Sequence, residues 1–204
     1  MKRGPKPQVT PEDWVAGVLS EMKKTDDVDF RIDVVARRLG VTKGSFYNYF
    51  ESKDEAVNRA LDAWLESENK VLAEMESTPV TGYEQIIERL FSTVGQFEYP
   101  LVFFLVGISR RHSEYHEFAR KVQRERYTRV ENMLYRLGVE PRTADRIAVA
   151  LIPSLFGLSY LEYAHLLETP SVPTTKEQRW AAVAAMTTEM VKKILDGEFP
   201  RQGR

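Results

Sequence analysis

Residues Arg31 to Lys53 (RIDVVARRLGVTKGSFYNYFESK) combine side chains that can contact a nucleic acid with the spacing of a short amphipathic helix. Phe46 and Phe50 are four residues apart, so they share one face of that helix and are expected to point inward. The opposite face then carries the set Lys43, Gly44, Tyr47 and Asn48, with Ser45 at its edge. A helix with such a face can enter the major groove of DNA.

Each residue type on this face has a defined use at DNA. Asn48 can form paired hydrogen bonds with an adenine edge, and Lys43 can reach guanine or a phosphate. Gly44 has no side chain, so its backbone can approach a phosphate closely. Tyr47 and Lys53 are expected to hold phosphates, which fixes the register of the protein on DNA without reading sequence.

Two short helices joined by a tight turn must position these side chains. Apolar residues at i, i+3, i+4 and i+7 predict the first helix, with Ile32, Val35, Ala36 and Leu39 on its buried face. Gly40 follows where a helix end favours a left-handed residue. Thr42 is expected to cap the second helix, whose apolar face is Phe46, Tyr49 and Phe50. This pattern is typical of a helix-turn-helix unit.

The stretch LGVTKGSFYNYFESKDEAV closely resembles the signature of the tetracycline-repressor (TetR-like) family of bacterial regulators, and the resemblance covers about residues 10–65. It implies a three-helix DNA-binding head, a long connecting helix and a variable all-helical body for ligand binding and dimerisation. It also implies DNA contacts at Thr42, Lys43, Gly44, Ser45, Tyr47, Asn48, Tyr49 and Lys53. Many relatives have an aromatic residue followed by histidine where this chain has Asn48-Tyr49, so the base preference is expected to differ.

Helical periodicity continues through the rest of the chain, and convincing period-two alternation is missing. Thr10, Pro11 and Asp13 predict the start of a first helix, and Ser52 with Glu55 predicts a long helix that reaches about residue 75. Further helices are expected over 83–97, 100–111, 114–137, 142–168 and 175–196. The prediction is an all-α protein of about nine helices. We expect a DNA-binding domain over 1–53 and a ligand-binding and dimerisation domain over 54–204, in which 54–76 is the connecting helix.

Composition narrows the function classes. The 204 residues include no cysteine, which excludes disulfides, thiolate nucleophiles and cysteine-ligated zinc. Neither a Gly-x-Ser-x-Gly elbow nor a glycine-rich phosphate loop occurs, so we expect no enzyme activity and no cofactor. His112 and His116, with Glu117, could ligate a metal if one helix carried them, but a solvent-facing polar cap is the favoured interpretation.

Charge and hydropathy give weaker indications. Residues 1–53 hold ten Lys or Arg against eight Asp or Glu, although the whole chain has a net charge of -1. The basic N-terminal residues 2–7 are either an arm that follows DNA or a solubilising tail, and the tail is the favoured interpretation. The most apolar windows, 101–108 and 147–161, are shorter than the ~18 residues of a membrane span. We therefore expect a soluble, cytoplasmic protein without a membrane partner.

Aromatic side chains are frequent after residue 83, and the resemblance implies a ligand cavity among them. The candidate ligand-binding residues are Phe91, Phe97, Phe103, Phe104, Phe118, Tyr127, Phe156 and Tyr160. Arg110, Arg111 and His112 either meet an anionic group of such a ligand or are solvated.

The last two predicted helices carry more apolar width than one core-facing stripe needs. They form either a bundle within one chain or a dimer interface across a two-fold axis, and the resemblance favours the dimer. The candidate interface residues are Leu151, Leu155, Leu158, Trp180, Val183, Ala184, Thr187 and Val191.

The predicted function is that of a dimeric repressor, released from a palindromic operator by a small, mostly apolar ligand. Two alternatives stay open. One is a ligand-dependent activator or corepressor-type regulator, and the other is a helical small-molecule-binding protein with a vestigial head.

Overall fold

The computed structural model describes residues 9–97, 101–164 and 175–197, and every regular element within these ranges is a helix. The all-α prediction is therefore confirmed. The predicted N-terminal arm and the end of the predicted helix 142–168 lie outside the described residues. The chain forms two compact units, Met1–Asn69 with Phe104–His116, and Lys70–Phe103 with Glu117–Arg204. We call them unit 1 and unit 2. Unit 1 extends past residue 53, the predicted boundary between the two domains. The division into a DNA-binding domain and a ligand-binding domain therefore stays a prediction.

Unit 1 contains α1 (Pro11–Thr25), α2 (Ile32–Leu39) and the 3₁₀ helix η1 (Lys43–Asn48), together with the first part of α3 (Lys53–Ser77). The predicted start of α1 is confirmed, because the Thr10 hydroxyl accepts from the Asp13 N–H and the Asp13 carboxylate accepts from the Thr10 N–H. The turn after α2 has the predicted left-handed glycine, with φ of 71° at Gly40.

Aromatic rings form the core of this head. Phe46 is fully buried, and its ring centroid lies 5.4 Å from that of Trp14 and 4.9 Å from that of Phe50. Phe30 packs on the same ring at 6.3 Å. The close approach of α1 to α2 depends on Gly17, where a Cβ atom would lie 2.8 Å from Cγ1 of Val35. This core gives the turn and η1 a rigid support.

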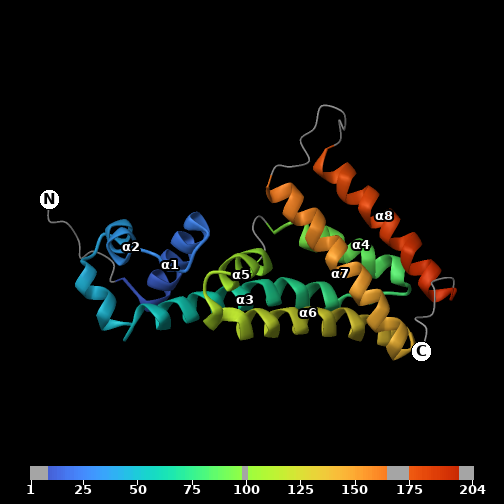
Figure 1. Cartoon of the computed structure of the whole chain (residues 1–204), viewed down its shortest axis with the longest axis horizontal. Helices are drawn as coiled ribbons and strands as arrows, with labels where there is room; N and C mark the ends of the chain where they lie inside the picture. Colours follow the sequence, from blue (N-terminus) through green and yellow to red (C-terminus); the bar gives the residue numbers. More distant parts are fainter. Residues whose placement is uncertain (1–8, 98–100, 165–174, 198–204) are drawn as a thin grey trace. The chain divides into compact units, whose positions relative to one another are not determined.

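Unit 2 is built from α4 (Tyr83–Val94), α6 (His116–Arg136), α7 (Pro141–Tyr163) and α8 (Lys176–Leu195). Helix α5 (Leu101–Ser109) contributes residues to both units, and a short 3₁₀ turn, η2 (Ser113–Tyr115), follows it. Within unit 2, α7 packs against α8 and α4, and α4 also packs against α8 (Figure 1). The core between them contains aliphatic side chains such as Ile86, Leu90, Ile147 and Leu151, and also the aromatic rings of Phe91 and Trp180.

The apolar stretch of helix α7 is longer than the window 147–161 that the sequence indicated. By length and composition alone it could cross a membrane, and 44% of the apolar stretch is buried inside the protein. Its buried side chains include Ile147, Leu151 and Leu155, which belong to the core of unit 2. Packing against α4 and α8 therefore accounts for much of its apolar character.

Candidate nucleic-acid interface

The predicted recognition helix is present as a six-residue 3₁₀ helix, η1, rather than as an α-helix. Thr42 stands at its N-cap position, but the Thr42 side chain forms no capping hydrogen bond. Instead, the Ser45 hydroxyl donates to the Thr42 carbonyl at 2.8 Å, and the Ser45 N–H donates to the same carbonyl at 3.1 Å. Helices of this type are short because their hydrogen-bond geometry is poorer than that of an α-helix.

The faces of η1 divide as the sequence predicts. Phe46 is fully buried, whereas Lys43, Gly44 and Asn48 are exposed. Tyr47 is 56% exposed, and its ring stands edge-on against Phe46 at 5.2 Å, so packing orients a side chain that remains accessible. The exposed set offers an ammonium group, a bare backbone, a phenol and an amide. Together these groups can contact phosphates and base edges.

Besides Ser45, two more of the eight candidate DNA contacts are engaged within the protein. The Tyr49 hydroxyl donates to the Val9 carbonyl at 2.7 Å, which ties the end of η1 to the residue before α1. The Lys53 ammonium lies 2.5 Å from Oδ1 of Asp29 and 5.1 Å from the centroid of the Phe30 ring. Tyr49 therefore has a positioning role, and a phosphate at Lys53 would compete with an exposed carboxylate.

A second support of the head escaped the sequence analysis. Glu21 is only 7% exposed, and its carboxylate accepts from the Arg38 guanidinium at 2.7 Å. Arg38 also donates to Ser20 at 3.1 Å, so α2 is held on α1 by a polar contact beside the aromatic core. The sequence does contain an indication that Glu21 is buried. Glu21 lies seven residues after Trp14 and three after Val18, which places it on the apolar stripe of α1.

The segment after α5 carries a contact that the sequence analysis did not foresee. His112 Nε2 lies 2.9 Å from Oδ1 of Asp27, and Arg111 Nε lies 3.0 Å from Oδ2 of the same carboxylate. Arg111 also donates to the carbonyl of Asp26, the left-handed residue at the end of α1. His112 and His116 lie at the break between α5 and α6, as expected for a polar cap, but the His112 ring is half-buried and bonded to Asp27, whereas His116 is exposed. We call this set of contacts the Asp27 latch.

The Asp27 carboxylate is held in its charged form. Burial alone would raise its pKa, but the Asp29 N–H, His112 and Arg111 together lower the pKa below the ordinary 3.8. Nearby, burial raises the pKa of Tyr115 to about 12, and the charges of Asp54 and Glu114 act in the same direction. Within the described residues, no group of three or more acidic or histidine side chains could hold a metal ion.

Among the cavities bordered by described residues, the candidate ligand-binding aromatics are spread over different ones. Phe91 faces a groove between α4 and α8, Phe156 lines a small interior cavity, and Tyr127 lies on an open surface of α6. Phe103 and Tyr160 form edge contacts with each other at 5.8 Å, and Tyr160 is exposed. The others are dispersed: Phe104 packs on Trp64 in unit 1, and Phe97 and Phe118 are half-buried.

Packing within one chain already buries most of the candidate dimer residues. The buried ones are Leu151, Leu155, Leu158, Trp180, Thr187 and Val191, whereas Val183 and Ala184 are half-buried. A dimer interface on α7 and α8 would have to use exposed residues next to these buried ones. The exposed apolar residues of these helices include Val149, Leu161 and Met186, and Met186 is 73% exposed.

One segment of this chain is similar to a known protein family, and the chain resembles solved structures. Residues 29–60 match the family model of bacterial regulatory proteins, tetR family. AmtR of Mycobacterium smegmatis is similar in structure, with a TM-score of 0.52 and 12% sequence identity over 93% of this chain and 89% of that one.

A TetR/AcrR-family regulator from Thermobifida fusca has a TM-score of 0.49 and 16% identity over 94% of this chain and 98% of that one. A search of curated proteins found no match. The matched residues 29–60 include η1 and its exposed face, so this segment is similar to the tetR family, and the likeness to AmtR shows a shared fold.

Proposed function

We propose that this protein is a dimeric transcriptional repressor that binds a palindromic operator and leaves it when a small molecule binds in the helical body. One observation carries the proposal: η1 presents Lys43, Gly44, Tyr47 and Asn48 to solvent while Phe46 anchors it in the core. Such an arrangement lets the head dock rigidly in a major groove. The role is binding rather than catalysis, in the bacterial cytoplasm where the chromosome lies.

The proposed DNA contacts are of two kinds: contacts to base edges, which recognise sequence, and contacts to phosphates, which fix the position of the protein. Asn48 is the candidate for an adenine edge, and Lys43 for guanine or a phosphate. Gly44 lets the backbone approach a phosphate, and Tyr47 supplies a phenol at the rim. The remaining candidates, Thr42, Ser45, Tyr49 and Lys53, support or flank this set.

A two-fold dimer would supply the second head. Helix α7 exposes Val149, Pro153, Gly157 and Leu161 at a spacing of four residues, which is one stripe of a helix. Helix α8 exposes Ala182, Ala185 and Met186. Small residues beside large apolar ones allow helices of two copies to pack closely, and the pairing sets the head spacing at one or more turns of about 34–36 Å.

The experiment is selection of bound fragments from a random duplex DNA pool at near-physiological salt, followed by sequencing. We expect enrichment of a two-fold symmetric site, and Asn48→Ala should relax preference at particular base pairs of each half-site. Binding without symmetry that disappears as salt rises would contradict the proposal, because only phosphate attraction would remain. A reporter assay on the selected site distinguishes repression from activation.

A further inference from the structure

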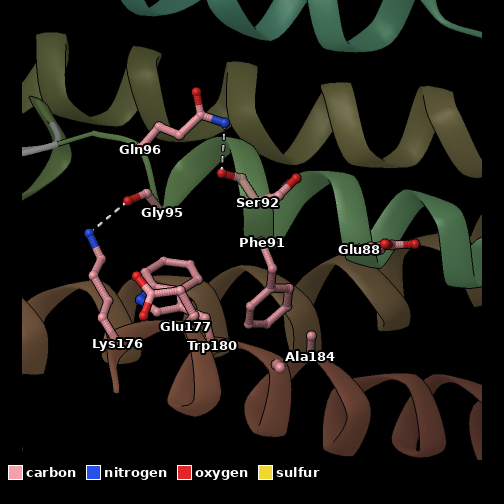
Figure 2. A pocket seen from close by; sticks show the side chains of 10 residues that line it. Glu88, Phe91, Ser92, Gly95, Gln96, Lys176, Glu177, Trp180 and Ala184 are labelled. Carbon is pink, nitrogen blue, oxygen red and sulfur yellow. Dashed lines mark hydrogen bonds between the residues drawn. The ribbon is translucent and has the colours of Figure 1, made fainter.

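A groove between α4 and α8 in unit 2 has the dimensions of a small-molecule site. Its volume is about 350 Å³, and its floor is formed by Phe91 and Trp180 with Ala184 beside them (Figure 2). Binding sites for small molecules usually measure about 300–1,000 Å³. The interior cavity bordered by Phe156 is much smaller, about 40 Å³, which is room for a water molecule or two.

The aromatic floor of the groove is rigid. Phe91 and Trp180 are both buried, and their ring centroids lie 5.9 Å apart at 76°. The end of α4 comes close to the indole because residue 95 is glycine, where a Cβ atom would lie 3.4 Å from the Trp180 ring. Helix α8 is fixed to α7 by an ion pair between Arg179 and Glu162 at 2.6 Å. A ligand would therefore meet a surface that is already formed.

The charged side chains at the rim favour a positive ligand. Glu88 and Glu177 border the groove from α4 and α8, and both are exposed. The third charged side chain, Lys176, donates its ammonium to the Gly95 carbonyl at 2.9 Å, which holds it at one end of the groove (Figure 2). The lining thus carries two carboxylates against one ammonium. Hydrogen bonds from its own backbone N–H and from Thr175 lower the pKa of Glu177, so this carboxylate is ionised at neutral pH.

We propose that the α4–α8 groove is the effector site and that it binds a small organic cation with an apolar body. The apolar body would lie on Phe91 and Trp180, whose ring faces attract a positive charge, and the cationic group would approach Glu88 or Glu177. The expected effect of the ligand on DNA binding rests on the proposed function. Binding of the cation to the groove does not depend on the proposed function.

The position of the groove suggests how occupation changes DNA binding. Helix α8 supplies Trp180 and Ala184 to the groove, and on its outer side it exposes Ala182 and Met186, the proposed dimer surface. A ligand that favours one arrangement of α8 on α4 over another would alter the dimer surface and with it the spacing of the two heads. The shift requires only that the ligand binds one arrangement more tightly than the other.

The test uses the full chain and three matched probes: (2-naphthylmethyl)trimethylammonium, 2-naphthylmethanol and naphthalene-2-sulfonate. Binding is followed by calorimetry and by the fluorescence of Trp180, with Trp14 and Trp64 replaced by phenylalanine in a parallel variant whose fold is checked by circular dichroism. We expect the cation to bind most tightly. Glu88→Gln with Glu177→Gln should weaken it about tenfold, since each exposed ion pair contributes modestly. Glu74→Gln, exposed on α3, should leave binding unchanged.

Two further measurements complete the test. Ala184→Phe fills the groove and should abolish binding of the cation, and the glutamine pair provides an independent readout if that variant unfolds. The proposal is overturned if the alcohol or the sulfonate binds as tightly as the ammonium compound, or if the glutamine pair has no effect. It is also overturned if the cation binds while operator affinity stays constant. Absence of any operator binding would instead refute the proposed function and leave the ligand measurement to stand alone.

Discussion

Replacing Asp27 by asparagine removes one negative charge from the Asp27 latch and keeps the size of the side chain. The carboxylate contacts His112 at 2.9 Å and Arg111 at 3.0 Å. His112 is 85 residues away from Asp27 along the chain. It also accepts from the Asp29 N–H at 3.1 Å, which the amide oxygen of asparagine can still do. The variant therefore tests the two contacts with residues 111 and 112.

The magnitude follows from exposure. The side chains of Asp27 and His112 are 28% and 26% exposed, so their contact is partly shielded from water, and it should contribute about 1 kcal/mol. Arg111 is 46% exposed, and its contact should contribute about 0.5 kcal/mol. Asp27→Asn should lower the free energy of unfolding by about 1–2 kcal/mol at pH 7.

The pH dependence has a definite sign. The folded-state pKa of Asp27 lies below its ordinary value of 3.8. A carboxyl group with a lowered pKa stabilises the folded state above its unfolded-state pKa, and this stabilisation disappears as pH falls through the folded-state pKa. The difference between the native protein and Asp27→Asn should therefore be full at pH 7 and should shrink below about pH 4.

Denaturant unfolding at pH 7 and at pH 3 measures the loss of unfolding free energy in Asp27→Asn and the change of this loss with pH. Asp62→Asn, an exposed position on α3 in the same unit, is the matched control and should have little effect. An equal destabilisation by Asp27→Asn at both pH values would refute the electrostatic reasoning. No destabilisation at pH 7 would refute the latch itself.

Four other variants test the head and the proposed assembly. Gly17→Ala should destabilise the head by about 1–3 kcal/mol in thermal unfolding, because the new Cβ would lie 2.8 Å from Val35. Lys53→Ala should weaken binding to all DNA sequences alike and reduce the salt slope by about one unit, whereas Asn48→Ala should change sequence preference in the same titrations. Met186→Glu, at a side chain 73% exposed, should shift the dimer to monomers in sedimentation without loss of helical content.

Each of these variants has a control and a contradicting outcome. Gly107→Ala places a Cβ no closer than 3.8 Å to a neighbour outside its own helix, so Gly17→Ala should be clearly more harmful. Identical effects of Lys53→Ala and Asn48→Ala on every sequence would contradict the division into holding and reading. Val106→Glu, at another exposed apolar side chain, should leave the oligomeric state unchanged. A Met186→Glu protein that remains dimeric would place the interface elsewhere.

Local patterns in the sequence determined the helical class and the layout of the head. Thr10 with Asp13 starts α1, and Gly40 ends α2 in a left-handed conformation, because these effects act within three or four residues. The spacing of Phe46 and Phe50 fixed which side of η1 is buried, and the exposed set followed from it. The predicted short helix is present, but it is a 3₁₀ helix, in which the Ser45 hydroxyl donates to the Thr42 carbonyl.

Only the tertiary structure decided which side chains meet across long separations. Nothing in the local pattern joins Lys53 to Asp29 or His112 to Asp27. Periodicity marked Trp180 as apolar, but it could not tell a core position from a dimer position, and the fold of one chain buries it. A helix pattern shows that a face is apolar without naming its partner. The partner depends on how several helices share one core, a property of the whole chain rather than of any segment.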